Sequence, residues 1–247
     1  MRGVLPAALA FAALLLASLA PPITALEDVP CGDLDGCPDL SVLPKDLARA
    51  RLTRETFAAD HCAVVEGYVA GGEARLLRFT TTYPNAGAGD LIVGAPSDHP
   101  DWFEWSPCHG HYHFREYADY RLWTEDGYRA WTSLRASNSG ALSGDLLAAN
   151  PSVAAEMVAG HKQGFCVIDV VRFDRRAGPA EYTSCSTDQG ISVGWADQYS
   201  FRLDGQWIDI TGLASGTYRL EVEVNAEHLF TESSYANNLV AAAVTVR

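Results

Sequence analysis

The chain has 247 residues, of which 48% are hydrophobic and 20% are charged, and its formal net charge is −13. This composition is typical of a globular protein with a proper core and excludes a disordered chain, while the length fits one large domain or at most two. A surface this acidic repels phosphate backbones, so nucleic acid is not an expected partner, and it attracts cationic partners such as amines or lysine-rich proteins.

The N-terminal segment, residues 1–25, carries Arg2, then an apolar run of alanine and leucine, then small residues near Ala25. This order is typical of a secretory signal peptide. The apolar run is short for a membrane span and two prolines follow it, so we expect a cleaved leader and no stable membrane anchor. The mature domain, residues 26–247, would be secreted, extracellular or periplasmic, where its cysteines can form disulfides.

The first half of the mature chain changes from irregular to β structure. Residues 31–40 are rich in glycine and aspartate and predict a loop closed by a local Cys31–Cys37 pair. A short helix is predicted within 43–52. Residues 62–83 predict a hairpin that turns at Gly71-Gly72, and residues 117–131 predict another that turns at Asp126-Gly127.

The second half predicts an excursion with one short helix in 143–161, where Pro151 interrupts a weak helical period. Short strands separated by turn signals follow, at 164–173, 206–211, 216–225 and 238–246. The expected fold is therefore mainly β: a single sandwich-like β domain with long loops and one or two short helices.

The stretch CHGHYHF, residues 108–114, places a histidine at every second position, at His109, His111 and His113. Alternate residues of a strand line one face, so the three imidazoles are predicted to converge on one point. Imidazole suits zinc and copper, the first for hydration and hydrolysis, the second for redox chemistry. An exposed or hydrogen-bonded histidine cluster without a metal stays open as the alternative.

Three blocks, in this order, resemble the lysyl oxidase family. Residues 101–123, DWFEWSPCHGHYHFREYADYRLW, are similar to its copper-binding strand, and GHKQGFC, residues 160–166, is similar to the segment that supplies its cofactor lysine. Residues 196–240, which begin ADQYSF, resemble the segment that contains its cofactor tyrosine. The resemblance covers roughly residues 38–247.

The resemblance implies that His109, His111 and His113 bind copper and that Lys162 and Tyr199 form lysine tyrosylquinone. It implies an amine oxidase that converts primary amines, including lysine side chains of protein substrates, to aldehydes with release of hydrogen peroxide and ammonia. Lys162 must be neutral when it adds to the oxidised ring, and burial or the charge of the metal would lower its pKa accordingly. Local pattern alone would make Lys162 a solvated surface lysine and Tyr199 an ordinary strand residue.

The cysteines depart from the family pattern. Tyr68 and Arg172 stand where animal members have the short-loop partners of two cysteines, so these two orphans are expected to pair with each other in an exported protein. The resemblance further implies a pair that anchors the histidine strand. The expected disulfides are Cys31–Cys37, Cys62–Cys166 and Cys108–Cys185.

A second departure concerns the proton-abstracting base. Animal members carry a histidine after the copper strand, and the nearest match here is Asp119 in EYADY. A carboxylate can do this work if burial or a neighbouring anion raises its pKa toward the operating pH. A solvated strand aspartate is the alternative for Asp119.

The segment ESSYANN, residues 232–238, resembles the family's calcium-binding segment. Its hard oxygen ligands suit Ca²⁺, although a serine replaces an aspartate and should weaken the site. The segment is alternatively only a turn before the last strand. The implied ligands are Asp39, the carbonyl of Leu40, Glu232, Ser234, Asn237 and Asn238.

Two other functions stay open. Residues 216–238 also resemble the closing strands of adhesion-type immunoglobulin-like domains, which is consistent with a non-catalytic exported β-sandwich that binds copper or zinc or serves adhesion. A zinc hydrolase built on the histidines is the other possibility, but no serine or cysteine nucleophile motif accompanies them. The sequence does not define an oligomeric state.

Overall fold

The structure, a computed structural model, describes residues 36–162 and 164–247. Its helices are α1 (Pro44–Leu47), α2 (Cys62–Val65), α3 (Glu125–Ser137), α4 (Ser143–Ala149) and α5 (Pro151–Ala154). Its strands are β1 (Arg51–Phe57), β2 (Gly72–Arg78), β3 (Thr81–Pro84), β4 (Leu91–Gly94), β5 (Phe103–Ser106), β6 (His111–Phe114), β7 (Ala118–Thr124), β8 (Met157–Ala159), β9 (Val171–Arg172), β10 (Gln189–Ile191), β11 (Trp195–Tyr199), β12 (Trp207–Asp209), β13 (Gly216–Val224) and β14 (Leu239–Val246). The expected mainly β fold is confirmed.

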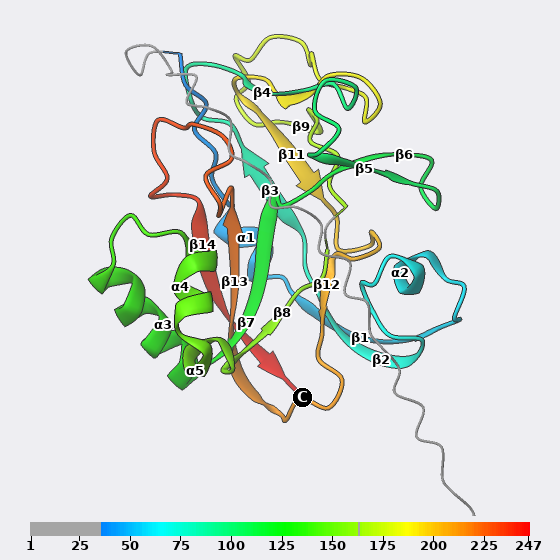
Figure 1. Ribbon diagram of the computed structural model, residues 1–247, viewed down its shortest axis with the longest axis vertical. Coiled ribbons are helices and arrows are strands. Elements are labelled where there is room, and N and C mark those ends of the chain that lie inside the picture. The colour runs from blue at the N-terminus through cyan, green and yellow to red at the C-terminus, as the bar shows by residue number, and fades with distance from the viewer. Residues whose placement is uncertain (1–35, 163) are drawn as a thin grey trace, which may run out of the picture.

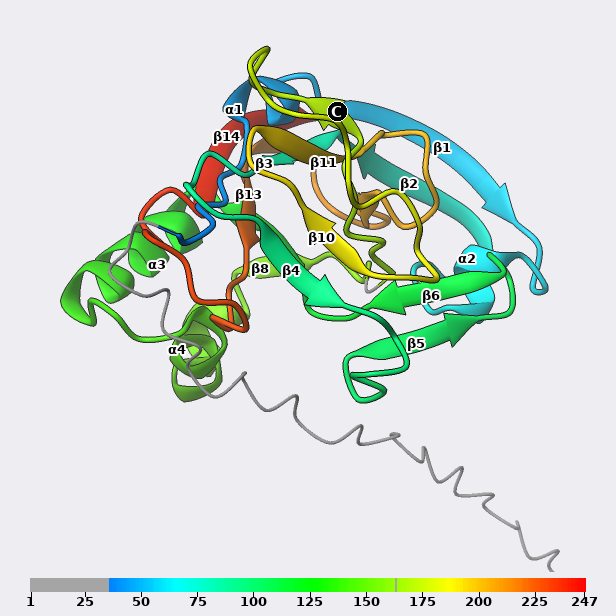
Figure 2. The same ribbon diagram turned by 90° about the horizontal axis from the view of Figure 1, so that it is seen from above.

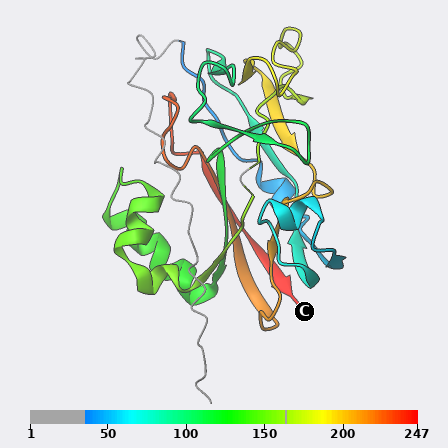
Figure 3. The same cartoon turned by 45° about the vertical axis from the view of Figure 1, so that its right-hand side comes forward.

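The largest sheet is antiparallel with strand order β14-β13-β7-β8. Helices α3, α4 and α5 gather on one side of it (Figure 1), and the turned view separates them from the rest of the molecule (Figure 3). Side chains of β13 alternate across this sheet: Tyr218, Leu220 and Val222 enter the core cluster, and Glu221 lies on the other face beside Trp131 of α3. Both faces of the sheet are therefore covered.

A second layer is formed by the sheets β3-β11-β9 and β1-β2-β12, and the core fills the space between the layers. Phe79, Tyr83 and Tyr199 meet Tyr120 and Phe165 there in a continuous aromatic cluster. The two-stranded sheets β4-β10 and β5-β6 lie together on one side of this core (Figure 2). Burial of each large apolar side chain contributes about 1.5–3 kcal/mol, so this cluster is a major source of stability.

The strand predictions for residues 206–246 are confirmed. β12, β13 and β14 fall within the predicted segments 206–211, 216–225 and 238–246. The register joins Gly216 to Val246 and Glu223 to Leu239, as expected of two long neighbouring strands. Short runs rich in apolar and β-branched residues, separated by turn signals, were a sufficient signal here because each strand pairs along most of its length.

The hairpin predicted within 62–83 is wrong. Residues Cys62–Val65 form α2, whose first turn is capped by His61 as its Nδ1 accepts from the Ala63 amide at 3.1 Å. The strand after Gly72 pairs instead with β1, beginning at Phe57 opposite Gly72. The helix therefore sits inside a wide connection between β1 and β2, and the glycine pair marks its end.

The hairpin predicted within 117–131 is also wrong. β7 runs straight into α3, and the Thr124 hydroxyl caps the helix by accepting from the Gly127 amide at 3.0 Å. Asp126 and Gly127 lie in the first helical turn, where an acidic residue favours the helix dipole. A Cβ at Gly127 would lie 2.4 Å from the Cβ of Glu156, so the glycine permits close packing and not a hairpin turn.

Two further segments differ from expectation. Residues 143–161 form α4, α5 and the strand β8, so the described part of the chain holds more short helices than predicted. In 164–173 only β9 pairs as a strand, with an isolated bridge at Phe165. The buried Asp169 carboxylate accepts from the amides of Glu181 and Ser192 and fixes this stretch as a loop through its side chain.

The predicted leader, residues 1–25, lies outside the described residues and stays a prediction. Across residues 36–162 and 164–247, none of the helices combines the length and apolarity needed to cross a membrane.

Candidate active site

The three histidines come together, but from two different local structures. His111 and His113 share one face of β6, while His109 precedes the strand on the turn that joins it to β5. Gly110 allows this turn because its φ is +68°, in the left-handed region that favours glycine. The prediction of a single strand carrying all three is thus wrong in its geometry, although the predicted convergence is found.

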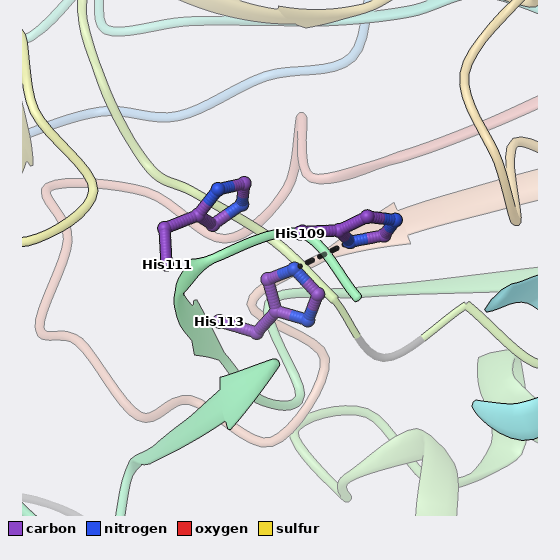
Figure 4. A group of neighbouring side chains, drawn as sticks. All are labelled: His109, His111 and His113. Carbon is purple, nitrogen blue, oxygen red and sulfur yellow. Dashed lines mark hydrogen bonds between the residues drawn. The ribbon is translucent and has the colours of Figure 1, made fainter. Parts of the chain in front are cut away.

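The imidazoles face one another closely enough to share an ion (Figure 4). His109 Nδ1 lies 3.1 Å from His113 Nε2, and one ring nitrogen from each histidine lies within 4.8 Å of the others. Burial lowers the pKa of His113 to about 4, and burial together with His109 lowers that of His111. Both rings are neutral at pH 7 and keep a lone pair for a metal, so the donor set fits copper or zinc.

A glycine brings the lysine segment against this cluster. A Cβ at Gly164 would lie 2.5 Å from His113 Nδ1 and 2.5 Å from the Tyr68 hydroxyl oxygen. No side chain fits there, and the backbone of residues near 164 therefore passes directly beside the histidine strand. This approach carries Lys162 to the same cavity.

Lys162 is buried, with 7% of its surface exposed, and is not a solvated surface lysine. Its Nζ lies 5.3 Å from the centre of the Tyr199 ring and 5.2 Å from that of Phe165. Burial lowers the pKa of Lys162 to about 8 even though Asp197 and Glu66 favour the charged form. A substantial fraction of this amine is therefore neutral slightly above neutral pH.

Tyr199 lies at the end of β11, and its hydroxyl donates to the Cys166 carbonyl at 2.9 Å. Burial, and then the nearby Asp197, hold the pKa of Tyr199 well above its usual value. Phe165 meets the ring edge-on with centres 5.2 Å apart. The phenol is thus protonated and fixed in orientation beside Lys162.

Asp197 was missed by the sequence reasoning. It precedes Tyr199 by two positions on β11, so both side chains project from the same face of the strand. Only 1% of Asp197 is exposed, its Oδ2 has no hydrogen-bond partner among the described residues, and burial raises its pKa well above the ordinary value. The strand spacing from Tyr199 was the signal that could have found it.

A cavity of about 700 Å³ contains this constellation. Its wall also includes the apolar side chains of Ile168, Val170 and Leu203, with Arg202 and Asp204 beside them. The chemical groups that line it are His109, His111, His113, Lys162, Asp197 and Tyr199.

Asp119 does not line this cavity. It lies on β7 and forms an ion pair with the buried Arg121, opposite Glu223 in the strand register. Its side chain is 40% exposed and lies at the edge of a separate charge cluster beneath α3, in which Arg121, Glu221 and Glu223 are buried. The structure thus separates Asp119 from the residues that the sequence analysis grouped with it.

The disulfides differ from the expected pairing. The structure joins Cys62 to Cys108 and Cys166 to Cys185, so the expected Cys62–Cys166 and Cys108–Cys185 pairs are wrong. Helix α2 lies against the turn that carries His109 and so brings Cys62 to Cys108. The sequence shows that the short-loop partners are replaced, but it does not show this contact. Cys37 is disulfide-bonded, and the expected Cys31–Cys37 pair reaches outside the described residues.

The oxygen-rich segment at residues 232–238 is brought to residues 39–40. The Glu232 carboxylate accepts from the Leu40 amide at 2.6 Å and from the Asn238 side chain at 2.7 Å, and Asn237 donates to Asp39 at 3.0 Å. Burial raises the pKa of Glu232 to about 7. The side-chain carbonyl oxygens of Asn237 and Asn238 are buried without a partner in the described structure.

Ser234 is placed differently from these residues. Its hydroxyl accepts from the Ala236 amide at 3.2 Å and so closes a local turn. The Leu40 contact with Glu232 runs through its amide and not its carbonyl. Of the residues implied as calcium ligands, Glu232 pairs with Asn238 and Asp39 pairs with Asn237, and the Asp39 carboxylate is close enough to contribute to the raised pKa of Glu232.

Fold and site together define a mainly β domain with three histidines able to bind a metal and a buried lysine beside a tyrosine. The family model described as lysyl oxidase matches residues 52–139 and 142–247. The chain belongs to the lysyl oxidase family, which confirms the resemblance found in the sequence.

Named relatives agree with this assignment. Protein-lysine 6-oxidase of Gallus gallus is 30% identical over 220 residues, which are 83% of this chain and 44% of the relative. Protein-lysine 6-oxidase of Homo sapiens is 34% identical over 169 residues, 67% of this chain and 32% of the relative. Lysyl oxidase homolog 1 of Homo sapiens is 34% identical over 167 residues, 67% and 24% respectively. The chain therefore spans less than half the length of these relatives.

Proposed function

We propose that this chain is a copper- and quinone-dependent amine oxidase in which Lys162 and Tyr199 form lysine tyrosylquinone. The observation that carries the proposal is the 5.3 Å separation of Lys162 Nζ from the Tyr199 ring, in the same cavity as the three histidines. A non-catalytic metal-binding or adhesion module has no need for a buried lysine of lowered pKa beside a tyrosine. The pair supports an enzyme over that alternative and over a zinc hydrolase.

His109, His111 and His113 would hold the copper ion. Copper would supply the redox chemistry that oxidises the tyrosine, and the resulting quinone would act as the electron sink for amine oxidation. Lys162 supplies a neutral amine because burial lowers its pKa. The Cys166 carbonyl orients the Tyr199 hydroxyl, and Phe165 excludes water from the space between the ring and the core.

We further infer that Asp197, and not Asp119, moves the substrate proton. Asp197 lies in the cavity, faces the same way as Tyr199 and has an unpartnered carboxylate oxygen, whereas Asp119 is bound to Arg121. A base that removes a proton from the carbon bearing the amine needs a pKa near the operating pH. The upward shift of the Asp197 pKa is in the required direction.

The substrates would be primary amines, including lysine side chains of proteins. A primary amine, oxygen and water would become an aldehyde, ammonia and hydrogen peroxide. The alkyl chain of the amine can lie along Ile168, Val170 and Leu203 in the cavity wall. With the predicted leader on residues 1–25, we place this activity outside the cytoplasm, in an extracellular or periplasmic setting.

Covalent chemistry between the two residues tests the proposal. Apo-protein given copper and oxygen should yield a peptide in which Lys162 and Tyr199 are cross-linked, detected by mass spectrometry. K162A should retain copper but form a quinone without its lysine link, and Y199F should retain copper and form no quinone. Amine oxidation by wild-type protein whose Lys162 and Tyr199 stay in separate unmodified peptides would refute the cofactor assignment.

A second proposal concerns calcium. Glu232 and the unpartnered carbonyl oxygens of Asn237 and Asn238 offer hard donors, and burial raises the pKa of Glu232 to about 7. These features support a Ca²⁺ site completed by Asp39. Because calcium competes with the proton on Glu232, its affinity should rise about tenfold from pH 6 to pH 8, which calorimetric titration measures.

A further inference from the structure

We propose that the Glu66 carboxylate is a fourth protein donor of the histidine metal site. This inference rests on the metal site of the proposed function but does not depend on amine oxidation. Glu66 follows α2 directly, and its side chain is 15% exposed. Its Oε2 atom is buried and has no hydrogen-bond partner among the described residues.

The Glu66 Oε2 atom lies at a distance from His109 Nδ1 that suits two donors of one metal ion. Glu66 Oε2 lies 3.7 Å from His109 Nδ1, and the same nitrogen lies 3.1 Å from His113 Nε2. Donors that bind one metal at about 2.0–2.2 Å are separated from each other by about 3–4 Å. Both separations fall in this range, and both are measured from His109 Nδ1. Glu66 lies outside the group of donors that are all within 4.8 Å of one another, so its side chain must turn toward His111 and His113 for one ion to reach all four residues.

Glu66 is held in this position by contacts with the turn that joins β5 to β6 and carries His109. The Ser106 hydroxyl donates to Glu66 Oε1 and accepts from the His109 amide at 3.0 Å. The Cys62–Cys108 disulfide joins the helix before Glu66 to the residue before His109. Oε1 is thus used to fix the side chain, the Tyr68 hydroxyl also contacts the carboxylate, and Oε2 faces His109 Nδ1 at 3.7 Å.

The chemistry favours an anionic oxygen at this place. A divalent ion bound only by imidazoles keeps its full double charge inside a half-buried site, and a carboxylate neutralises part of that charge. Three nitrogen donors and one oxygen donor suit copper or zinc equally. The proposal therefore concerns the donor set and not the choice of metal.

The test removes the charge of the Glu66 side chain and keeps its size and shape. Apo-protein is titrated with Cu(II) in competition with a chelator, and the electron paramagnetic resonance spectrum of the bound ion is recorded. We expect E66Q to weaken Cu(II) binding at least tenfold and to change the g and hyperfine values. The control is E104Q, because Glu104 is an exposed carboxylate on β5 opposite His113 and should leave both readouts unchanged.

The spectrum separates a donor from a merely supporting residue. E66Q protein with the wild-type spectrum, whatever its affinity, would overturn the proposal. E66D keeps the charge but withdraws the carboxylate by one methylene, so it should also alter the spectrum, and it decides the question if E66Q does not fold. If the wild-type chain binds no copper, the metal site and this inference are both wrong. If the wild-type chain binds copper and E66Q leaves its spectrum unchanged, only this inference is wrong.

Discussion

Two buried clusters of charged residues differ in how completely their polar atoms are paired. Beneath α3, Arg121 is 2% exposed and donates to Asp119, Glu221 and Glu223. The Trp131 indole donates a further hydrogen bond to Glu221 at 3.1 Å. Burial raises the pKa of Glu223, but Arg121 and Arg135 more than offset this and leave the pKa below its usual value.

The second cluster consists of the charged groups that line the cavity together with Glu66, which lies beside His109, and it is incompletely paired. Asp197 Oδ2 and Glu66 Oε2 have no hydrogen-bond partner in the described structure, and the pKa of Lys162 is lowered by burial. Unpaired buried groups are costly, so a fold retains them where a ligand, ion or reaction uses them. The comparison teaches that a buried charged residue is not by itself a sign of a functional site. A buried charged residue with a polar atom that lacks a hydrogen-bond partner is the more informative sign.

The largest expected effect is at the histidines. H111A should abolish copper retention and with it formation of the cross-link, because two imidazoles remain where three converge. Metal analysis after dialysis measures retention. H228A is the matched control, since that histidine stacks on Tyr235 away from the cavity. If H111A protein still binds one copper per chain and forms quinone, the metal assignment is wrong.

Replacement of the two aspartates tests the comparison directly. D197N should retain copper and the cross-link but lower kcat/KM for a primary amine by about 10²–10⁴, the usual contribution of a positioned base. D119N should stay within a few-fold of wild type because Asp119 pairs with Arg121 outside the cavity. The reverse ranking in a steady-state peroxide assay would restore Asp119 as the base.

The paired cluster should respond in stability and not in metal binding. R121M leaves the carboxylates of Glu221 and Glu223 buried without their main cation and should lower the free energy of unfolding by about 3–5 kcal/mol. R176M removes an exposed pair with Asp174 and should change little. Urea denaturation measures both, and copper affinity of folded R121M should equal that of wild type. A lowered affinity would mean that the two clusters are coupled.

The pH dependence of cofactor formation follows from Lys162. Its pKa of about 8 lies below the ordinary value, so the reactive neutral amine increases as pH rises through 8. The neutral fraction grows about tenfold between pH 7 and pH 9, and the rate of cross-linking at saturating copper should grow in proportion. Bound copper would shift this rise to lower pH. A rate that falls over this range would show that another step controls the reaction.

The smallest expected effect is that of ionic strength. If the net charge of −13 helps to capture cationic substrates, kcat/KM for a lysine-rich protein should fall several-fold between low and physiological salt. The value for a small monoamine should change less. Equal salt dependence of the two substrates would mean that the acidity does not contribute to capture.

The sequence predicted those parts of the fold and site in which the signal is local. β13 alternates apolar and polar residues along its length, β12 and β14 are mostly apolar runs next to turn signals, and the three histidines are recognisable from their spacing. Helix α3 was mistaken for a hairpin because Asp126-Gly127 suits a tight turn as well as a helix start, and the close approach of Glu156 that requires the glycine comes from a distant segment.

The cavity residues depended on long-range placement. Besides the neighbouring Phe165, the side chains that bury Lys162 include Tyr68 and Tyr199, which belong to distant segments, so no local pattern could report its lowered pKa. The disulfide partners likewise follow from where α2 packs. The resemblance to the family pointed to Lys162 and Tyr199 as candidate site residues. It did not point to Asp197, which reaches the cavity because it lies on the same face of β11 as Tyr199.

The tight contact at Gly164 makes this position intolerant of variation. An added methyl group would overlap both the imidazole of His113 and the hydroxyl of Tyr68, so both side chains would have to shift. An alanine there would act as a wedge that separates the lysine segment from the histidine strand. The distance between Lys162 and the three histidines is therefore set by the absence of a side chain at Gly164.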